Sequence, residues 1–242
     1  TQKLGNPDNM RALEFRSPIQ EAAKLVPELR ARADVVIAAT HMGHYANGQH
    51  GIQAPGDVEM ARAVTGLDLV VGGHTQNPAC MKAENVLDTA YVPGTPCQPD
   101  RQNGTWIVQA HEWGKYVGRA DFQYRNGEFT LVKYALVPIN LKHTPPIAED
   151  PQMLALLQPY QAFGQSKLLV NVGSSDARLE GDRSVVRKAP TSLGMLIGQA
   201  MMDKTRSDFA VVNAGGIRDS LPAGPITYKD ILKVQPFGNT LA

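Results

Sequence analysis

Two apolar runs, each followed by a histidine, constrain the fold of this chain more than any other feature. Residues 34–40 lead into His41, and residues 67–73 lead into His74. Both runs are continuous rather than alternating, which is typical of strands that are buried on both faces of a parallel sheet. A helical pattern over residues 57–65 lies between them. The sequence therefore predicts a βαβ unit with a right-handed crossover, and an α/β fold class.

Other segments extend this prediction along the chain. Ser17 is placed to cap a helix, Pro18 suits its first turn, and Asn126-Gly127 is a strong hairpin signal. A stretch rich in Pro and polar residues, 138–151, indicates a domain boundary. We expect helices at 18–32, 151–165 and 191–204, an antiparallel meander of strands at 105–110, 117–124 and 129–137, and further strands at 168–173 and 208–213.

Composition excludes two kinds of partner. With 242 residues, the chain can bury a core in one large domain or two modest ones. The formal net charge of +1 provides no bulk attraction to nucleic-acid polymers or to anionic membranes. No apolar stretch approaches the roughly 20 residues that a membrane span needs. The chain starts at Thr1 in a loop-like stretch without a signal peptide, so we expect it to be part of a longer protein.

His41, His74 and Gln76 form the first candidate site. Ligands gather at the carboxyl ends of parallel strands, so both histidines are expected at one edge of the sheet. Neutral imidazole is the commonest metal ligand among protein side chains. Gly72 and Gly73 permit close backbone approach, and a Gln two residues after a His on an extended segment points to the same side. The pattern favours a divalent metal site of the kind that activates water for hydrolysis.

The remaining histidines are weaker candidates. His44 and His50 lie in a Gly-rich loop, where solvated side chains are the favoured interpretation. His111 lies at a predicted strand end and could support the metal site. A metallo-β-lactamase-like motif at His41 would require a second His where this chain has Gly43, so we set that class aside.

Three arginines form the second candidate site. Arg183 and Arg187 lie four residues apart ahead of a predicted helix, and Arg218 follows a Gly-Gly turn. Guanidinium groups bind phosphate oxygens bidentately, so a phosphate site competes with ordinary surface salt bridges as the interpretation. Phe237 lies in a turn-like segment, either as a core or loop anchor or as a stacking surface for a base.

The two cysteines, Cys80 and Cys97, flank a loop rich in Pro and Gly. Composition leaves two interpretations open, a pair of free buried thiols or a disulfide that closes the loop in an oxidising compartment. A zinc site built on cysteines would need further Cys pairs, which this sequence lacks.

Four motifs resemble those of the two-metal 5'-nucleotidases, a family that includes bacterial periplasmic UDP-sugar hydrolases. They are Thr-His-Met-Gly-His at 40–44, Gly-Gly-His-Thr-Gln at 72–76, Asn-Ala-Gly-Gly-Ile-Arg-Asp at 213–219 and Gln-Pro-Phe-Gly-Asn at 235–239. The resemblance implies the C-terminal part of a calcineurin-like metallophosphatase β-sandwich layer domain at 1–143, a linker with a helix at 144–167, and the first part of a 5'-nucleotidase C-terminal α/β domain at 168–242.

The resemblance also implies roles for individual residues. His41 and His74 match ligands of one metal ion, Gln76 matches a ligand of the other, and Cys80 matches a cysteine that pairs with Cys97. The substrate-binding positions of the family are matched by Arg183, Arg187, Asn213, Arg218 and Phe237. The family's catalytic His has no counterpart in this chain, so we expect it upstream of residue 1.

For the whole protein, the resemblance implies a periplasmic monomer without a membrane span. It would use two divalent ions of the Zn, Mn or Co class to hydrolyse nucleotide phosphate esters and nucleotide-sugar pyrophosphates. The 242 residues alone are expected to be inactive, because they hold only part of each site. The alternative is a non-catalytic nucleotide-binding module that uses the arginines and Phe237 without metal.

Overall fold

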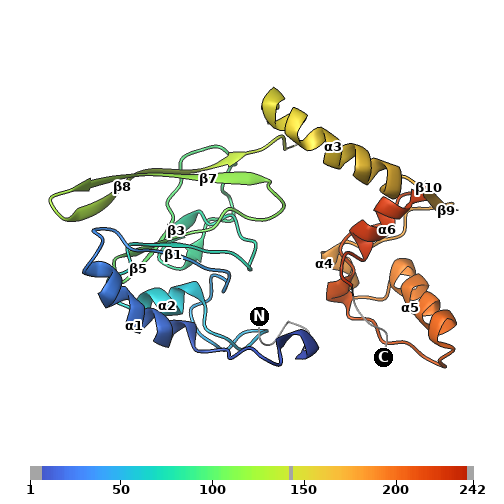
Figure 1. The fold of residues 1–242 in the computed structure, drawn as a ribbon, viewed down its shortest axis with the longest axis horizontal. Coiled ribbons are helices and arrows are strands. Elements are labelled where there is room, and N and C mark those ends of the chain that lie inside the picture. Colours follow the sequence, from blue (N-terminus) through green and yellow to red (C-terminus); the bar gives the residue numbers. More distant parts are fainter. Residues whose placement is uncertain (1–6, 142–143, 239–242) are drawn as a thin grey trace. The chain divides into compact units, whose positions relative to one another are not determined.

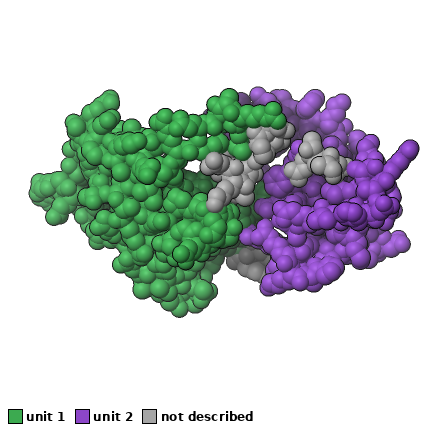
Figure 2. Space-filling model, turned by 90° about the horizontal axis from the view of Figure 1, so that it is seen from below, with its two compact units in different colours: residues 1–148 green, residues 149–242 purple. Residues whose placement is uncertain are grey.

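The computed structural model describes residues 7–141 and 144–238. The chain divides into two compact units, Thr1–Ala148 and Glu149–Ala242, which Figure 2 shows in different colours. Each unit has a hydrophobic core of its own. Within the described residues, no helix is long and apolar enough to cross a membrane.

The first unit is built on a four-stranded sheet. Its strand order is β1 (Ile37–Ala39), β2 (Leu69–Val71), β6 (Thr105–Val108) and β5 (Asp100–Gln102). The first three strands are parallel, and β5 pairs antiparallel with β6 at the edge. The parallel pairing of β1 with β2, joined through α2 (Asp57–Ala63), confirms the predicted βαβ unit.

Two helices pack against this sheet, α1 (Pro18–Arg30) and α2 (Figure 1). As expected, Ser17 caps α1 and its side chain accepts a hydrogen bond from the backbone N–H of Gln20. The chain also contains a short 3₁₀ helix, η1 (Pro7–Met10). The core between helices and sheet consists of Val26, Val36, Val58, Met60, Ala61, Val64, Leu67, Val70 and Ile107. The burial of these side chains holds the β1 and β2 ends in place.

The expected three-stranded meander is wrong. β6 joins the parallel sheet beside β2, whereas β7 (Tyr116–Arg125) and β8 (Glu128–Pro138) form a separate two-stranded antiparallel ribbon. The loop between β6 and β7 contains positive φ angles at His111, Trp113 and Gly114, which break the extended path that a meander needs.

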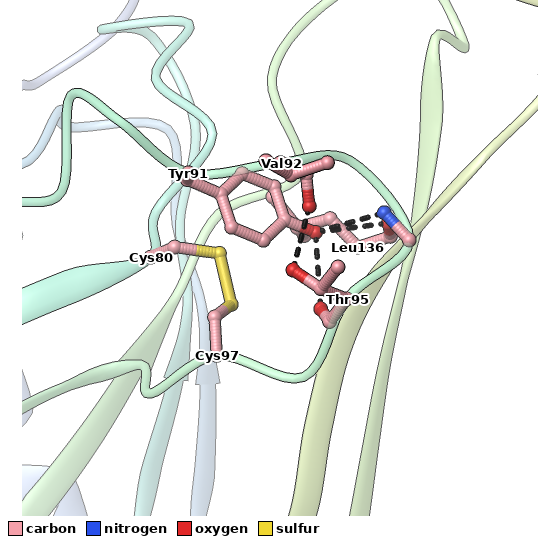
Figure 3. Close-up of a disulfide and its surroundings, with 7 residues drawn as sticks. Cys80, Tyr91, Val92, Thr95, Cys97 and Leu136 are labelled. Carbon is pink, nitrogen blue, oxygen red and sulfur yellow. Dashed lines mark hydrogen bonds between the residues drawn. A yellow bond between two sulfur atoms is a disulfide. The ribbon is translucent and has the colours of Figure 1, made fainter.

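The disulfide implied by the resemblance is present, between Cys80 and Cys97 (Figure 3). It encloses the small hairpin of β3 (Met81–Ala83) and β4 (Val86–Leu87). Cys80 is fully buried and packs with Tyr134 and Leu136 of β8. In the enclosed loop, the Tyr91 hydroxyl donates to the carbonyl oxygen of Leu136 at 3.2 Å. The crosslinked loop is thereby attached to the ribbon.

The second unit is helical with one small sheet. β9 (Asn171–Ser175) pairs antiparallel with β10 (Gly224–Thr227). The helical elements are α3 (Pro151–Leu168), α4 (Arg183–Val186), α5 (Ser192–Thr205), η2 (Ala214–Gly216) and α6 (Tyr228–Val234). The core of the unit consists of Val186, Leu193, Ile217, Leu221, Ile226 and Val234. The mixed helix and strand content of the two units confirms the predicted α/β (α+β) fold class.

The strand expected at 208–213 is not formed. Within the described part of the chain, no strand pairs with this segment, and the side chains of Phe209 and Val211 are 76% and 87% exposed. Strand propensity produces a strand only where a neighbour completes the backbone hydrogen bonds. The apolar sequence alone was therefore an insufficient guide here.

Candidate functional site

His41 and His74 lie beside each other at the carboxyl ends of β1 and β2. Their ring centroids are 5.5 Å apart and the rings meet edge to face at 75°. His74 and Gln76 both have left-handed backbone angles, with φ of 76° and 59°. The structure thus brings the two histidines together and places Gln76 on the same short loop as His74.

The two glycines before His74 are required by this close packing. A side chain at Gly72 would overlap the Asp57 carboxylate oxygen Oδ2, and a Cβ at Gly73 would lie 2.6 Å from His41 Nδ1. A real Cβ does not approach a neighbouring atom so closely, so glycine at position 73 makes room for the His41 ring and glycine at position 72 makes room for the buried Asp57 carboxylate.

Asp57 is a carboxylate that the sequence analysis did not single out as functional. Its side chain is fully buried at the start of α2, and Thr40 Oγ1 donates to Asp57 Oδ1 at 2.6 Å. Burial raises the pKa of Asp57 to about 6, although the hydrogen bond from Thr40 and the nearby His44 and His41 oppose this rise. Acidic residues are common at helix N-termini, so the sequence offered no signal that separated Asp57 from an ordinary one.

His74 itself has a perturbed pKa. Burial lowers the pKa of His74, and the neighbouring His41 lowers it further. The shift favours the neutral imidazole, which is the form that coordinates metal ions.

The residues fit a part of a metal site rather than a complete one. Among the residues that the structure describes, no group of three or more His, Cys, Asp and Glu side chains could hold a metal ion. Two imidazoles with an amide nearby match the nitrogen and oxygen donors that Zn, Mn and Co ions accept.

His111 stacks on Tyr116 with ring centroids 5.7 Å apart.

The structure contradicts the prediction that His44 and His50 are solvated. The His44 side chain is 4% exposed, and its Nε2 donates to Asp100 Oδ2 at 2.7 Å. His50 is half-buried and stacks on Tyr45 at 3.6 Å between ring centroids. The partner of His44 lies 56 residues along the chain and is supplied by tertiary packing, whereas His50 stacks on a residue of its own loop. Residue composition shows neither contact, which is why a Gly-rich loop looked solvated in the sequence.

In the second unit, the candidate substrate residues surround the turn at η2. Asn213 caps this turn and accepts a hydrogen bond from the backbone N–H of Gly215 at 3.1 Å. Arg218 Nη1 donates to the carbonyl oxygen of Gly215 at 3.3 Å, and its Cζ lies 5.8 Å from the ring centroid of Phe237. The structure therefore places these three predicted residues within one small region.

The other two predicted arginines belong to the neighbouring helix. Arg183 is the first residue of α4 and Arg187 directly follows its last. α4 packs against η2, and the guanidinium group of Arg187 lies next to Gly215. The exposed side chain of Arg187 leaves its guanidinium group accessible to a ligand.

Comparison with known proteins shows that the chain is similar to 5'-nucleotidases. A model described as the 5'-nucleotidase C-terminal domain matches residues 171–242. The whole chain aligns at 57% identity with Protein UshA of Yersinia enterocolitica and at 50% identity with a 5'-nucleotidase of Vibrio cholerae. The chain is similar to 5'-nucleotidases over its whole length, and residues 171–242 match the C-terminal domain of these enzymes. It covers 47% of each of these two relatives and so spans about half of their length.

Solved 5'-nucleotidase structures have the same fold. A 5'-nucleotidase precursor from Thermus thermophilus superposes with a TM-score of 0.65 at 31% identity, over 93% of this chain and 43% of that one. A putative 5'-nucleotidase from Staphylococcus aureus has a TM-score of 0.58 at 20% identity, over 97% of this chain and 43% of that one. The second likeness supports the fold alone.

The buried His44–Asp100 pair predicts a specific dependence of stability on pH. Burial acts to raise the pKa of Asp100, but hydrogen bonds from His44, the backbone N–H of Asn85 and the side chain of Gln102 outweigh it and lower the pKa. A carboxylate with a lowered pKa stabilises the folded state above the pKa of the unfolded chain, and this contribution is lost as the pH falls below about 4.

We expect Asp100→Asn to lower the free energy of unfolding by about 2 kcal/mol at pH 7, because a hydrogen-bonded buried charge is lost. The difference from the wild type should shrink as the pH falls from 5 to 3. Urea denaturation at several pH values measures both effects. Asp121→Asn is a suitable control, because Asp121 pairs with Arg119 on the surface. A difference that stays constant over this pH range would contradict the prediction.

Proposed function

We propose that the whole protein hydrolyses nucleotide phosphate esters and nucleotide-sugar pyrophosphates with the help of divalent metal ions. The observation that carries this proposal is the His41–His74 pair. The two histidines follow the ends of two parallel strands, and their ring centroids are 5.5 Å apart. The 50% identity to a 5'-nucleotidase of Vibrio cholerae supports the same reaction class. In this proposal, residues 1–143 contribute to a metallophosphatase domain, 144–167 form a linker and 168–242 contribute to the substrate domain.

Two metal ions of the Zn, Mn or Co class would bind here. His41 and His74 would hold one of them, and Gln76 would be a ligand of the other. When bound, such ions polarise phosphoryl oxygens and lower the pKa of water. The residues of this chain prepare that arrangement. Gly73 allows the close approach of His41, Gly72 allows that of the Asp57 carboxylate, and burial lowers the pKa of His74, which favours its neutral form.

Arg183, Arg187 and Arg218 would hold the phosphate groups of a nucleotide or nucleotide sugar, because guanidinium groups bind phosphate oxygens in pairs. Asn213 shapes the turn that positions Arg218. Phe237 would stack on the base, and the nearby Arg218 lies close enough to its ring for a cation–π contact. The disulfide agrees with an oxidising compartment, so we propose that the protein is periplasmic. We also propose that it is a monomer.

Metal removal separates this proposal from the alternative of a non-catalytic nucleotide-binding module. The whole protein is assayed for phosphate release from AMP and for formation of UMP and glucose 1-phosphate from UDP-glucose. Each assay is run before and after dialysis against a chelator and after return of Zn²⁺, Mn²⁺ or Co²⁺. We expect chelation to abolish hydrolysis and metal return to restore it. Nucleotide binding without hydrolysis under every metal condition would favour the binding module and overturn the proposal. The 242 residues alone are expected to release negligible phosphate.

The arginine site makes a separate prediction. Arg218→Met should raise the dissociation constant for AMP about 10- to 100-fold, because a hydrogen bond to a charged group contributes about 1.5–3 kcal/mol. Isothermal titration calorimetry measures this effect. Arg206→Met removes the same charge from the residue that directly follows α5 and serves as the control. Equal weakening in both variants would indicate a general charge effect and contradict a specific role for Arg218.

A further inference from the structure

Gln109 makes an unusual set of hydrogen bonds directly after β6. Its side chain is buried, with 2% of the residue exposed. Gln109 Oε1 accepts from Thr75 Oγ1 at 2.9 Å and from the backbone N–H of Asn77 at 2.8 Å. Gln109 Nε2 donates to the carbonyl oxygen of Gly73 at 3.0 Å. One carboxamide thus contacts three points of a single loop.

These three points alternate with the candidate metal ligands. Gly73, Thr75 and Asn77 are bonded to Gln109, and the residues between them are His74 and Gln76. We infer that Gln109 is a positioning residue, which holds His74 and Gln76 in the geometry that metal binding requires. This inference rests on the proposed function of the site and adds the group that builds it.

The backbone of the loop needs such support. His74 and Gln76 both adopt left-handed φ angles, which are unfavourable for residues with side chains. Strained conformations of this kind persist when surrounding contacts determine them. Three hydrogen bonds from a buried side chain are contacts that can hold both residues in this conformation.

The same hydrogen bonds also connect the loop of His74 to the loop after β1, which carries His41 and His44. Thr75 Oγ1 donates to Gln109 and also accepts from the backbone N–H of His44 at 3.2 Å. His44 follows His41 by three residues, so the loop after β1 and the loop after β2 share one hydrogen-bonded chain that ends at Gln109. The side chain at position 109 must accept two hydrogen bonds and donate one, and the carboxamide of glutamine can do both.

Cobalt binding tests the inference, because Co²⁺ has a visible spectrum that reports ligand geometry independently of activity. Three forms of the whole protein are compared, the wild type, Gln109→Met and Gln109→Glu. Each is stripped of metal and then titrated with Co²⁺. We expect Gln109→Met to weaken Co²⁺ binding about 10- to 100-fold and to alter the spectrum, as is typical when a group that orients a metal ligand is lost. In turnover assays, kcat should fall while KM for AMP stays within about threefold, since the phosphate-binding arginines are unchanged.

Thr105→Val is the matched control, because it removes a buried hydrogen bond at the opposite end of the same strand. Thr105 Oγ1 donates to the carbonyl oxygen of Leu67 at 2.8 Å, and Thr105 is 1% exposed. We expect Thr105→Val to lower thermal stability with Co²⁺ affinity and spectrum unchanged. If Gln109→Met fails to fold, Gln109→Glu retains acceptor oxygens for Thr75 and Asn77 and should show the same spectral change through loss of the donor to Gly73.

One result would contradict the positioning role of Gln109, and a different result would contradict the metal site itself. Wild-type Co²⁺ affinity and spectrum in the Gln109 variants, beside weak binding in His74→Ala, would overturn the positioning role alone. Wild-type Co²⁺ affinity in His74→Ala would overturn the proposed metal site itself.

Discussion

Alanine in place of His74 or His41 is expected to lower kcat/KM for AMP about 1,000-fold in the whole protein. Metal ions contribute several kcal/mol of transition-state stabilisation, and about 4 kcal/mol corresponds to this factor. Either substitution removes one imidazole of a pair whose ring centroids are 5.5 Å apart. Steady-state phosphate release with saturating Mn²⁺ measures the effect. The dissociation constant for AMP should change little, because the arginines belong to the second unit.

His50→Ala is the matched control for these two variants. His50 is a half-buried histidine from the same loop as His41, and it stacks on Tyr45, whereas His41 contacts His74 directly. We expect its loss to leave kcat/KM within about threefold of the wild type. Unchanged turnover in His41→Ala and His74→Ala would remove the metal assignment, and an equal loss in all three variants would indicate a stability effect.

Reduction of the Cys80–Cys97 disulfide is expected to lower the free energy of unfolding by about 3 kcal/mol. The crosslink closes a loop with a sequence separation of 17, and loops of this size confer about that amount in the chain-entropy model. The disulfide also holds the loop whose Tyr91 hydroxyl reaches Leu136 of β8 (Figure 3). Urea denaturation with and without dithiothreitol measures the difference.

The reduced wild type separates the crosslink from side-chain packing. Both cysteine side chains remain in it, whereas Cys80→Ala also leaves a space where a fully buried residue packs against Tyr134. We therefore expect the Cys80→Ala/Cys97→Ala variant to be somewhat less stable than the reduced wild type and insensitive to dithiothreitol. A wild type whose unfolding midpoint does not change on reduction would contradict the prediction.

The parts of the fold that the sequence predicted correctly depend on local patterns. Continuous apolar runs identified β1 and β2 and their parallel pairing. The expected burial of both strands on both faces is wrong, because Ile37 of β1 and Val71 of β2 are exposed. The cap at Ser17 and the hairpin at Asn126-Gly127 were predicted correctly because each needs only neighbouring residues.

The incorrect predictions share a dependence on distant partners. β6 was expected to pair with the strand that follows it, but it pairs with β2 instead. The segment 208–213 has the composition of a strand and lacks a paired neighbour within the described residues. A local pattern shows that a segment is apolar, but it does not show which other segment supplies the hydrogen bonds.

The candidate site divides along the same line. The sequence by itself determined which side chains follow the strand ends, His41 and His74, and that glycines precede the second of them. Only the tertiary structure decided that Asp100 binds His44 and that Gln109 holds the loop of His74. The physical reason is that a strand end is a property of consecutive residues, whereas a buried hydrogen bond needs two groups that chain folding brings together.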